Sequence, residues 1–263
     1  MKNTPLLTLL FCIFATSLIG QQIFFPSNAP HPRADKMYKE AVYHLMNLEH
    51  RKFYHKIEKL LAEEPKIFMA QAHRAFHVFH IKGNKYPFEK FAKYALSCEP
   101  KGDVEETYAK ILETKLADPK ADVSKLLNGL IERHNHIEAN FLLSNYYLEV
   151  GEVKNAYQVL FKCYRKNTYY PPLMNLLAHT SKEMGNMEMA IYYMAEYIKR
   201  HPDDADAYDS MGNFLFKDKD YKGAIKNYEK AASLSKKYKS SLTKAEKIKK
   251  HLAEAKTKKR RIR

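Results

Sequence analysis

The second half of the chain repeats itself with a period of 34 residues. Segments that begin at Ile137, Pro171 and Ala205 align without a gap. Small residues occupy the eighth and the twentieth position of each segment, namely Ser144, Ala178, Gly212, Ala156, Ala190 and Ala224. Between the eighth and the twentieth position of each segment lies a pair of residues that contains Gly, Asn or Asp, where a short turn can reverse the chain. Because small residues let two helices cross closely, each segment is predicted to be a helical hairpin that stacks on its neighbours.

This pattern resembles the tetratricopeptide repeat family. The residues of the last segment that match the family pattern are Tyr208, Gly212, Tyr221, Ala224, Tyr228 and Ala231, and Pro202 closes the segment before it. The resemblance implies an all-α fold, a right-handed superhelical solenoid of antiparallel helix pairs over residues 35–236. The repeats that match the pattern are 137–170, 171–204 and 205–236, and a further repeat is expected at 69–102. Two more, at 35–68 and 103–136, rest on length and helical periodicity.

The sequence changes character after Lys236. Residues 243–246 read as a capping box, and Ala245, Ile248 and Leu252 make a narrow apolar stripe. We therefore expect a capping helix at 237–255, because a repeat array needs a polar cover at its end. Residues 256–263 show no apolar pattern and are predicted to be a disordered basic tail. The basic residues of this tail are Lys256, Lys258, Lys259, Arg260, Arg261 and Arg263.

Most of the formal charge of +15 lies at this end of the chain. Thirteen basic and two acidic residues follow Leu234, which gives +11. A flexible basic end attracts acidic polymers through counterion release and attracts anionic lipid head groups. The tail is therefore a candidate anion-binding site, and a solubilising role is the alternative. No aromatic residue follows Tyr238, so no specific nucleic-acid readout is expected.

The first twenty residues have the three parts of a secretory signal peptide. Lys2 is followed by an apolar run over 6–14, and small residues follow at Ala15, Ser17 and Gly20. Cleavage is expected after Ser17 or after Gly20, which leaves residues 21–34 as a linker to the first repeat. An uncleaved N-terminal anchor is the alternative, although the apolar run is short for a membrane span. The prediction is an exported protein, periplasmic or secreted, of bacterial source.

Three histidines share one helix face in the repeat at 69–102. Their spacing is i, i+4 and i+7. In the family the first helix of each repeat lines the concave surface, so the resemblance places these histidines in a groove. The predicted protein-binding groove consists of His73, His77, His80, Phe141, Asn145, Asn175, His179, Lys182, Asn213 and Phe216. Such amide and aromatic groups suit an extended peptide, and a solvated helix face without a ligand is the alternative.

The histidine spacing also permits a metal site, because two imidazoles four residues apart can chelate zinc. No carboxylate accompanies them in the required motif and no fourth ligand is identifiable, so no metal and no cofactor are predicted. The chain has no Gly-rich phosphate loop, no GxSxG and no HExxH motif. Cys98 and Cys163 fall in different hairpins and are expected to be buried thiols.

The sequence therefore predicts a non-enzymatic, exported protein–protein interaction scaffold. Its groove would bind a peptide segment or a partner helix. The alternative is a binder of anionic polymers or membrane surfaces that acts through its basic tail.

Overall fold

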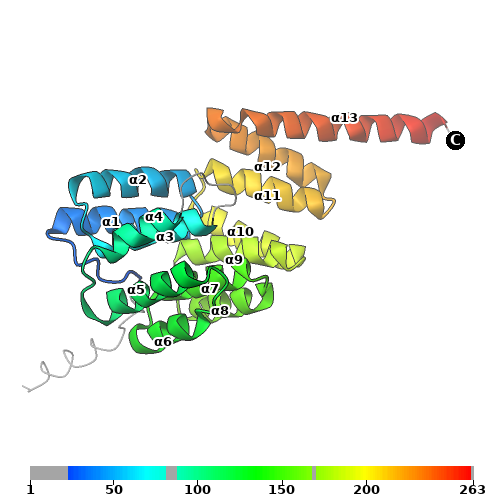
Figure 1. The fold of residues 1–263 in the computed structure, drawn as a ribbon. Coiled ribbons are helices and arrows are strands. Elements are labelled where there is room, and N and C mark those ends of the chain that lie inside the picture. Colours follow the sequence, from blue (N-terminus) through cyan, green and yellow to red (C-terminus); the bar gives the residue numbers. More distant parts are fainter. Residues whose placement is uncertain (1–22, 81–87, 168–169, 262–263) are drawn as a thin grey trace, which may run out of the picture.

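The computed structural model describes residues 23–80, 88–167 and 170–261, without the side chains of residues 79–80 and 255–261. The predicted signal peptide and the side chain of His80 lie outside this description. Within the described ranges the chain forms helices and no strand (Figure 1), which confirms the predicted all-α solenoid. The helices are α1 (Pro32–Met46), α2 (His50–Glu63), α3 (Phe68–His80), α4 (Phe88–Leu96), α5 (Gly102–Ala117), α6 (Ser124–His134), α7 (Ile137–Glu149), α8 (Val153–Lys166), α9 (Pro171–Glu183), α10 (Met187–Arg200), α11 (Ala205–Lys217), α12 (Tyr221–Leu234), the short 3₁₀ helix η1 (Lys236–Tyr238) and α13 (Lys239–Arg261).

The turns and crossings of the hairpins follow from particular residues. Gly151 and Gly185 turn the chain with positive φ angles of 82° and 78°, a conformation that glycine adopts without steric cost. In the last hairpin Lys219 takes this left-handed conformation instead, with φ of 67°. A Cβ atom on Gly212 would lie only 2.6 Å from Cδ1 of Tyr228. The glycine therefore lets α11 and α12 approach closely enough to bury that tyrosine ring.

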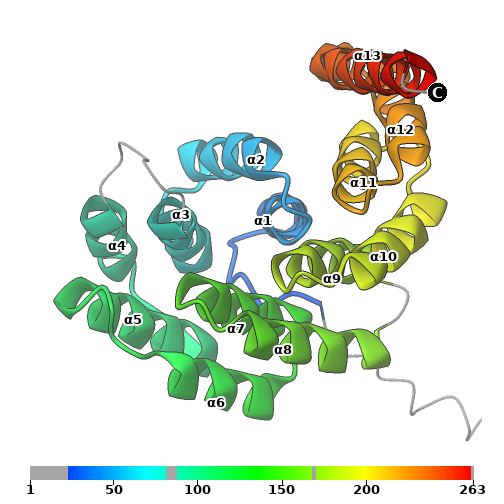
Figure 2. The same cartoon turned by 90° about the vertical axis from the view of Figure 1, so that its right-hand side faces the viewer.

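The odd-numbered helices α3, α5, α7 and α9 lie toward the inside of the curve, and their even-numbered partners lie outside (Figure 2). Helix α1 lies within the curve and contacts α9 as well as α2. The array therefore closes on itself, so that its first and fifth hairpins touch. The core consequently runs unbroken from Phe25 to Phe214.

Two predicted boundaries are corrected by the structure. Residues 23–31 are not a free linker, because Phe25 is fully buried and α1 already begins at Pro32. The tail predicted to be disordered is helical as far as Arg261, since α13 continues through it. Lys and Arg have high helix propensity, so the helix can continue through them from the packed part of α13.

Helix α13 packs on α12 through its first half only. Ser241, Ala245 and Ile248 are buried there, and Leu252 is half-buried. Figure 1 shows the C-terminal half of α13 extending beyond α11 and α12. In the described ranges, no helix combines the length and the apolar character that crossing a membrane requires.

Candidate functional site

The inner surface of the first four hairpins is filled by the chain itself. Residues 23–31 run across it without regular secondary structure. The ring of Phe25 lies 5.8 Å from that of Tyr108 and 4.5 Å from that of His136, measured between centroids. The chain's own N-terminal segment therefore occupies this part of the concave surface.

A buried carboxylate, that of Glu138, holds this arrangement together. It has no exposed surface, and its Oε2 accepts a hydrogen bond of 2.9 Å from the backbone N–H of Phe25. The other oxygen, Oε1, accepts one of 2.9 Å from the hydroxyl of Tyr38 and lies 2.6 Å from Nε2 of His73. Burial and the nearby carboxylate raise the pKa of Tyr38, so its hydroxyl keeps the proton that it donates. A buried charge needs such partners, because an unpaired one is very costly.

The prediction of a partner-facing groove is wrong for His73, His77 and Phe141. His73 is fully buried beside Glu138, and Phe141 is 1% exposed in the core. His77 is 5% exposed and packs against the ring of Phe53, with centroids 4.8 Å apart. The physical reason is that α1, α2 and the N-terminal segment cover the inner face that the repeat frame would leave open.

The last repeat is also occupied by the chain itself. Asn213 was predicted to face a partner, but its side-chain oxygen accepts hydrogen bonds from Tyr228 at 3.0 Å and from Lys244 of α13 at 3.3 Å. Lys244 also pairs with Asp209 at 2.9 Å. The capping helix therefore holds these polar side chains, while Phe216 stays 46% exposed.

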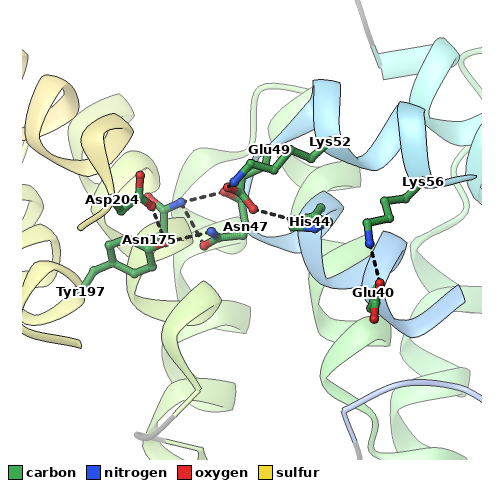
Figure 3. Close-up of polar contacts among 9 residues, drawn as sticks. All are labelled: Glu40, His44, Asn47, Glu49, Lys52, Lys56, Asn175, Tyr197 and Asp204. Carbon is green, nitrogen blue, oxygen red and sulfur yellow. Dashed lines mark hydrogen bonds and ion pairs between the residues drawn. The ribbon is translucent and has the colours of Figure 1, made fainter. Parts of the chain in front are cut away.

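Between these two filled regions lies an open cleft, where the α1–α2 turn faces the junction of α10 and α11 (Figure 3). Its volume is about 770 Å³. Its lining residues come from the α1–α2 turn, the α10–α11 turn and the region around η1, and include Tyr43, His44, His50, Arg51, Lys52, Arg200, His201, Asp203, Asp206, Lys237 and Tyr238. The cleft lies where the two ends of the curved array meet.

A chain of hydrogen bonds forms the floor of the cleft (Figure 3). Asn175 donates to the backbone oxygen of Asn47 at 2.9 Å, and Asn47 donates through Nδ2 to the hydroxyl of Tyr197 at 2.8 Å. Tyr197 in turn donates to Asp204 at 2.9 Å. Asn175 is thus committed within the protein and is not a groove residue. Leu48 adopts a positive φ of 62°, a rare conformation for a residue with a side chain, and it directs this turn across the cleft.

Charged side chains line both sides of the cleft. The beginning of α2 carries Arg51 and Lys52, the α10–α11 turn carries Asp203, and Asp206 lies in the first turn of α11. On the α2 side Glu49 pairs with His44 at 2.6 Å and also with Lys52 (Figure 3). The α2 wall of the cleft therefore presents Arg51, and the opposite wall presents Asp203 and Asp206 together with Arg200 and Lys237.

His179 lies below this cleft, in a smaller space that it shares with Asn175 and Asp204. Its ring meets that of Phe214 edge-on, with 5.4 Å between centroids. Burial, followed by the charge of Lys182, lowers the pKa of His179 to about 4. The ring is therefore neutral at physiological pH.

Two other predicted groove residues are neither buried nor fully exposed. Asn145 and Lys182 are half-buried, and Lys182 pairs with Glu183 at 2.5 Å. Their role in binding stays a prediction. Sequence reasoning missed Asn47, Tyr197 and Asp204, because a 34-residue frame relates neighbouring hairpins and carries no signal for contacts between the first and the fifth.

In the described ranges, no three His, Cys, Asp or Glu side chains gather closely enough to hold a metal ion. Cys98 and Cys163 are buried and form no disulfide. Burial raises the pKa of the Cys163 thiol to about 12, so this thiol is protonated and unreactive at neutral pH.

Comparison with known proteins agrees with this architecture. The family model of the tetratricopeptide repeat matches residues 205–238. The chain is similar to the crystal structure of PilW, a widely conserved type IV pilus biogenesis factor, with a TM-score of 0.50 and 19% identity over 81% of this chain and 98% of that one. It is also similar to a thermophilic tetratricopeptide-repeat protein of Thermus thermophilus, with a TM-score of 0.47 and 16% identity over 61% of this chain and 88% of that one. No curated protein matches by sequence. At such identity the likeness to PilW concerns the fold alone.

Proposed function

Because the chain contains a tetratricopeptide repeat and folds as an array of such hairpins, we propose that it is an exported scaffold that binds a segment of another protein. The binding site of this proposal is the cleft between the α1–α2 turn and the α10–α11 turn. One observation carries the proposal: this cleft stays open while the chain's own residues fill the concave surface on either side of it. The proposal involves no catalytic step and no cofactor.

The chemistry of the cleft suits a polar peptide with an aromatic or aliphatic anchor. Tyr43 and Tyr238 supply apolar ring surface, and the ring of His201 stacks on that of Tyr197 at 4.8 Å between centroids. Aromatic anchors of this kind contribute much of the binding energy at protein interfaces. The charges on the two walls would fix the direction of the bound segment, because complementary charges select orientation and partner.

Charge reversal on both walls is expected to weaken peptide binding. Peptides selected from a random library on the mature protein should lose about tenfold in affinity for an Arg51→Glu, Asp203→Lys double variant, since rim charges mainly steer and orient a ligand. The matched control is Lys90→Glu with Glu106→Lys, which makes the same charge changes at exposed positions outside the cleft. Titration calorimetry measures both. Equal affinity for the two double variants would contradict the assignment of the cleft.

Export is part of this proposal and rests on the signal-peptide pattern of residues 1–20. N-terminal sequencing of the protein isolated from its own cells tests it. A mature chain that begins at Leu18 or Gln21 supports export with cleavage, and a chain that retains residues 1–17 contradicts it.

A second candidate activity is the binding of an acidic polymer or an anionic membrane surface through α13. The observation that favours it is the extension of this helix beyond the rest of the molecule, with Lys and Arg throughout its last turns. Removal of residues 256–263 deletes six positive charges and is expected to abolish salt-sensitive retention on heparin and on anionic vesicles. Retention that survives this deletion would show that the tail plays no part.

A further inference from the structure

The N-terminal segment is bound to the solenoid as a peptide ligand would be. The backbone oxygen of Ile23 accepts a hydrogen bond of 3.0 Å from the N–H of Glu138, whose carboxylate accepts the N–H of Phe25. Further along, the amide of Asn28 donates to the backbone oxygen of Lys101 at 3.2 Å and to Glu105 at 2.9 Å. These contacts join residues at least 70 positions apart. The segment is thus held by docking rather than by local secondary structure.

The docking has one dominant anchor. Phe25 is fully buried and contacts the rings of Tyr108, His134 and His136, with centroids 5.8, 6.3 and 4.5 Å away. The neighbouring Phe24 is only half-buried. A single buried aromatic side chain next to a backbone hydrogen bond is the usual energetic centre of a peptide complex.

We propose that the inner surface lined by α5, α6 and α7 is a peptide-binding site that the chain fills with its own residues 23–29, and that it accepts the same segment in trans from a second copy once its own segment is removed or weakened. The chemistry of the site defines the ligand. Glu138 requires a backbone N–H at the position of Phe25, and the pocket requires an aromatic ring there. Residues 21–30 carry no charged side chain. This suits the site, because the carboxylate of Glu138 is already bonded to Tyr38 and the N–H of Phe25 and needs no cationic side chain from the ligand.

The binding test uses a chain that starts at Ala29 and a synthetic peptide of residues 21–30, QQIFFPSNAP. The peptide is expected to bind the truncated chain and not the mature chain that starts at Gln21, because the mature chain already holds this segment. Peptides with Phe25→Ala and Phe24→Ala form a matched pair. The first should bind at least about 30-fold more weakly, as loss of a buried aromatic hot spot does, and the second less than about fivefold. Titration calorimetry measures the wild-type peptide on both chains and the two variant peptides on the truncated chain.

Truncation could also unfold the chain, and the test covers this case. A ligand that binds only the folded state stabilises it, so added peptide is then expected to restore the helical circular dichroism signal. A mature chain with Phe25→Ala provides a second receptor, since its weakened segment should yield to labelled wild-type peptide. The inference is overturned if neither receptor binds the peptide and the peptide restores no helix. It is also overturned if the Phe24→Ala and Phe25→Ala peptides bind equally well.

Discussion

Replacement of Glu138 by alanine is expected to lower the free energy of unfolding by about 3–5 kcal/mol, the range seen when one partner of a buried, hydrogen-bonded charge is removed. The carboxylate is fully buried and is the acceptor for Tyr38 at 2.9 Å and for the N–H of Phe25 at 2.9 Å. His73 lies 2.6 Å from it and is also fully buried. Alanine would leave the N–H of Phe25 without this acceptor, and Tyr38 with only Nε2 of His73 at 3.2 Å, in a space that water cannot easily fill.

Urea denaturation followed by circular dichroism measures this loss. The matched control is Glu132→Ala on α6, where the glutamate is exposed and the expected change is within about 0.5 kcal/mol. Glu138→Gln keeps the volume and one acceptor oxygen, so it should fall between the two. A loss below about 1 kcal/mol for Glu138→Ala would mean that the cluster does not hold the N-terminal segment in place.

The repeat period predicted the C-terminal half of the fold closely. Helices α7, α9 and α11 begin at Ile137, Pro171 and Ala205, the same residues at which the aligned segments begin. This succeeded because small residues at the crossings and turn residues between the helices are local requirements that each hairpin must meet. The position of Gly212 against the ring of Tyr228 shows how strict one such requirement is.

The same reasoning failed where contacts join distant parts of the chain. Asn47 meets Tyr197 across 150 positions, and Phe25 meets Glu138 across 113. A repeat pattern describes how each hairpin packs on the next, but the accumulated curvature that closes the array depends on every interface at once. His73 and His77 were consequently assigned to an open groove, whereas α1 and α7 cover the first and α2 covers the second.

These distant contacts also explain why so little of the predicted groove is available to a partner. An unoccupied array would expose the polar face of each inner helix, whereas here the N-terminal segment covers α5 and α7 in part and α13 covers part of α11. The cleft at the α1–α2 turn is where the closing ends of the array meet. Its shape therefore depends on the Asn47–Tyr197–Asp204 hydrogen bonds as much as on any single repeat.

Acidification is expected to destabilise the protein partly through His179. Burial lowers the pKa of this ring to about 4, whereas an unfolded histidine titrates near about 6.5. Below this pH the unfolded chain takes up a proton that the folded chain does not, so the contribution of the neutral buried ring is present above about pH 6.5 and is lost as the pH falls toward the folded pKa. Between about pH 7.5 and 4.5 this linkage removes about 2 kcal/mol from the free energy of unfolding.

The variant His179→Gln isolates this effect, because glutamine fills a similar volume beside Phe214 and does not titrate. His50 and His136, whose pKa values burial also lowers, remain in both proteins and cancel in the comparison. Urea denaturation at about pH 7.5 and about pH 4.5 should show that the variant loses about 2 kcal/mol less than the wild-type protein over this interval. Equal losses would mean that His179 is already protonated in the folded state at the lower pH. The space below the cleft would then hold a charged ring. The hydrogen bonds among Asn47, Tyr197 and Asp204, which form the floor of the cleft, would have to be assigned anew.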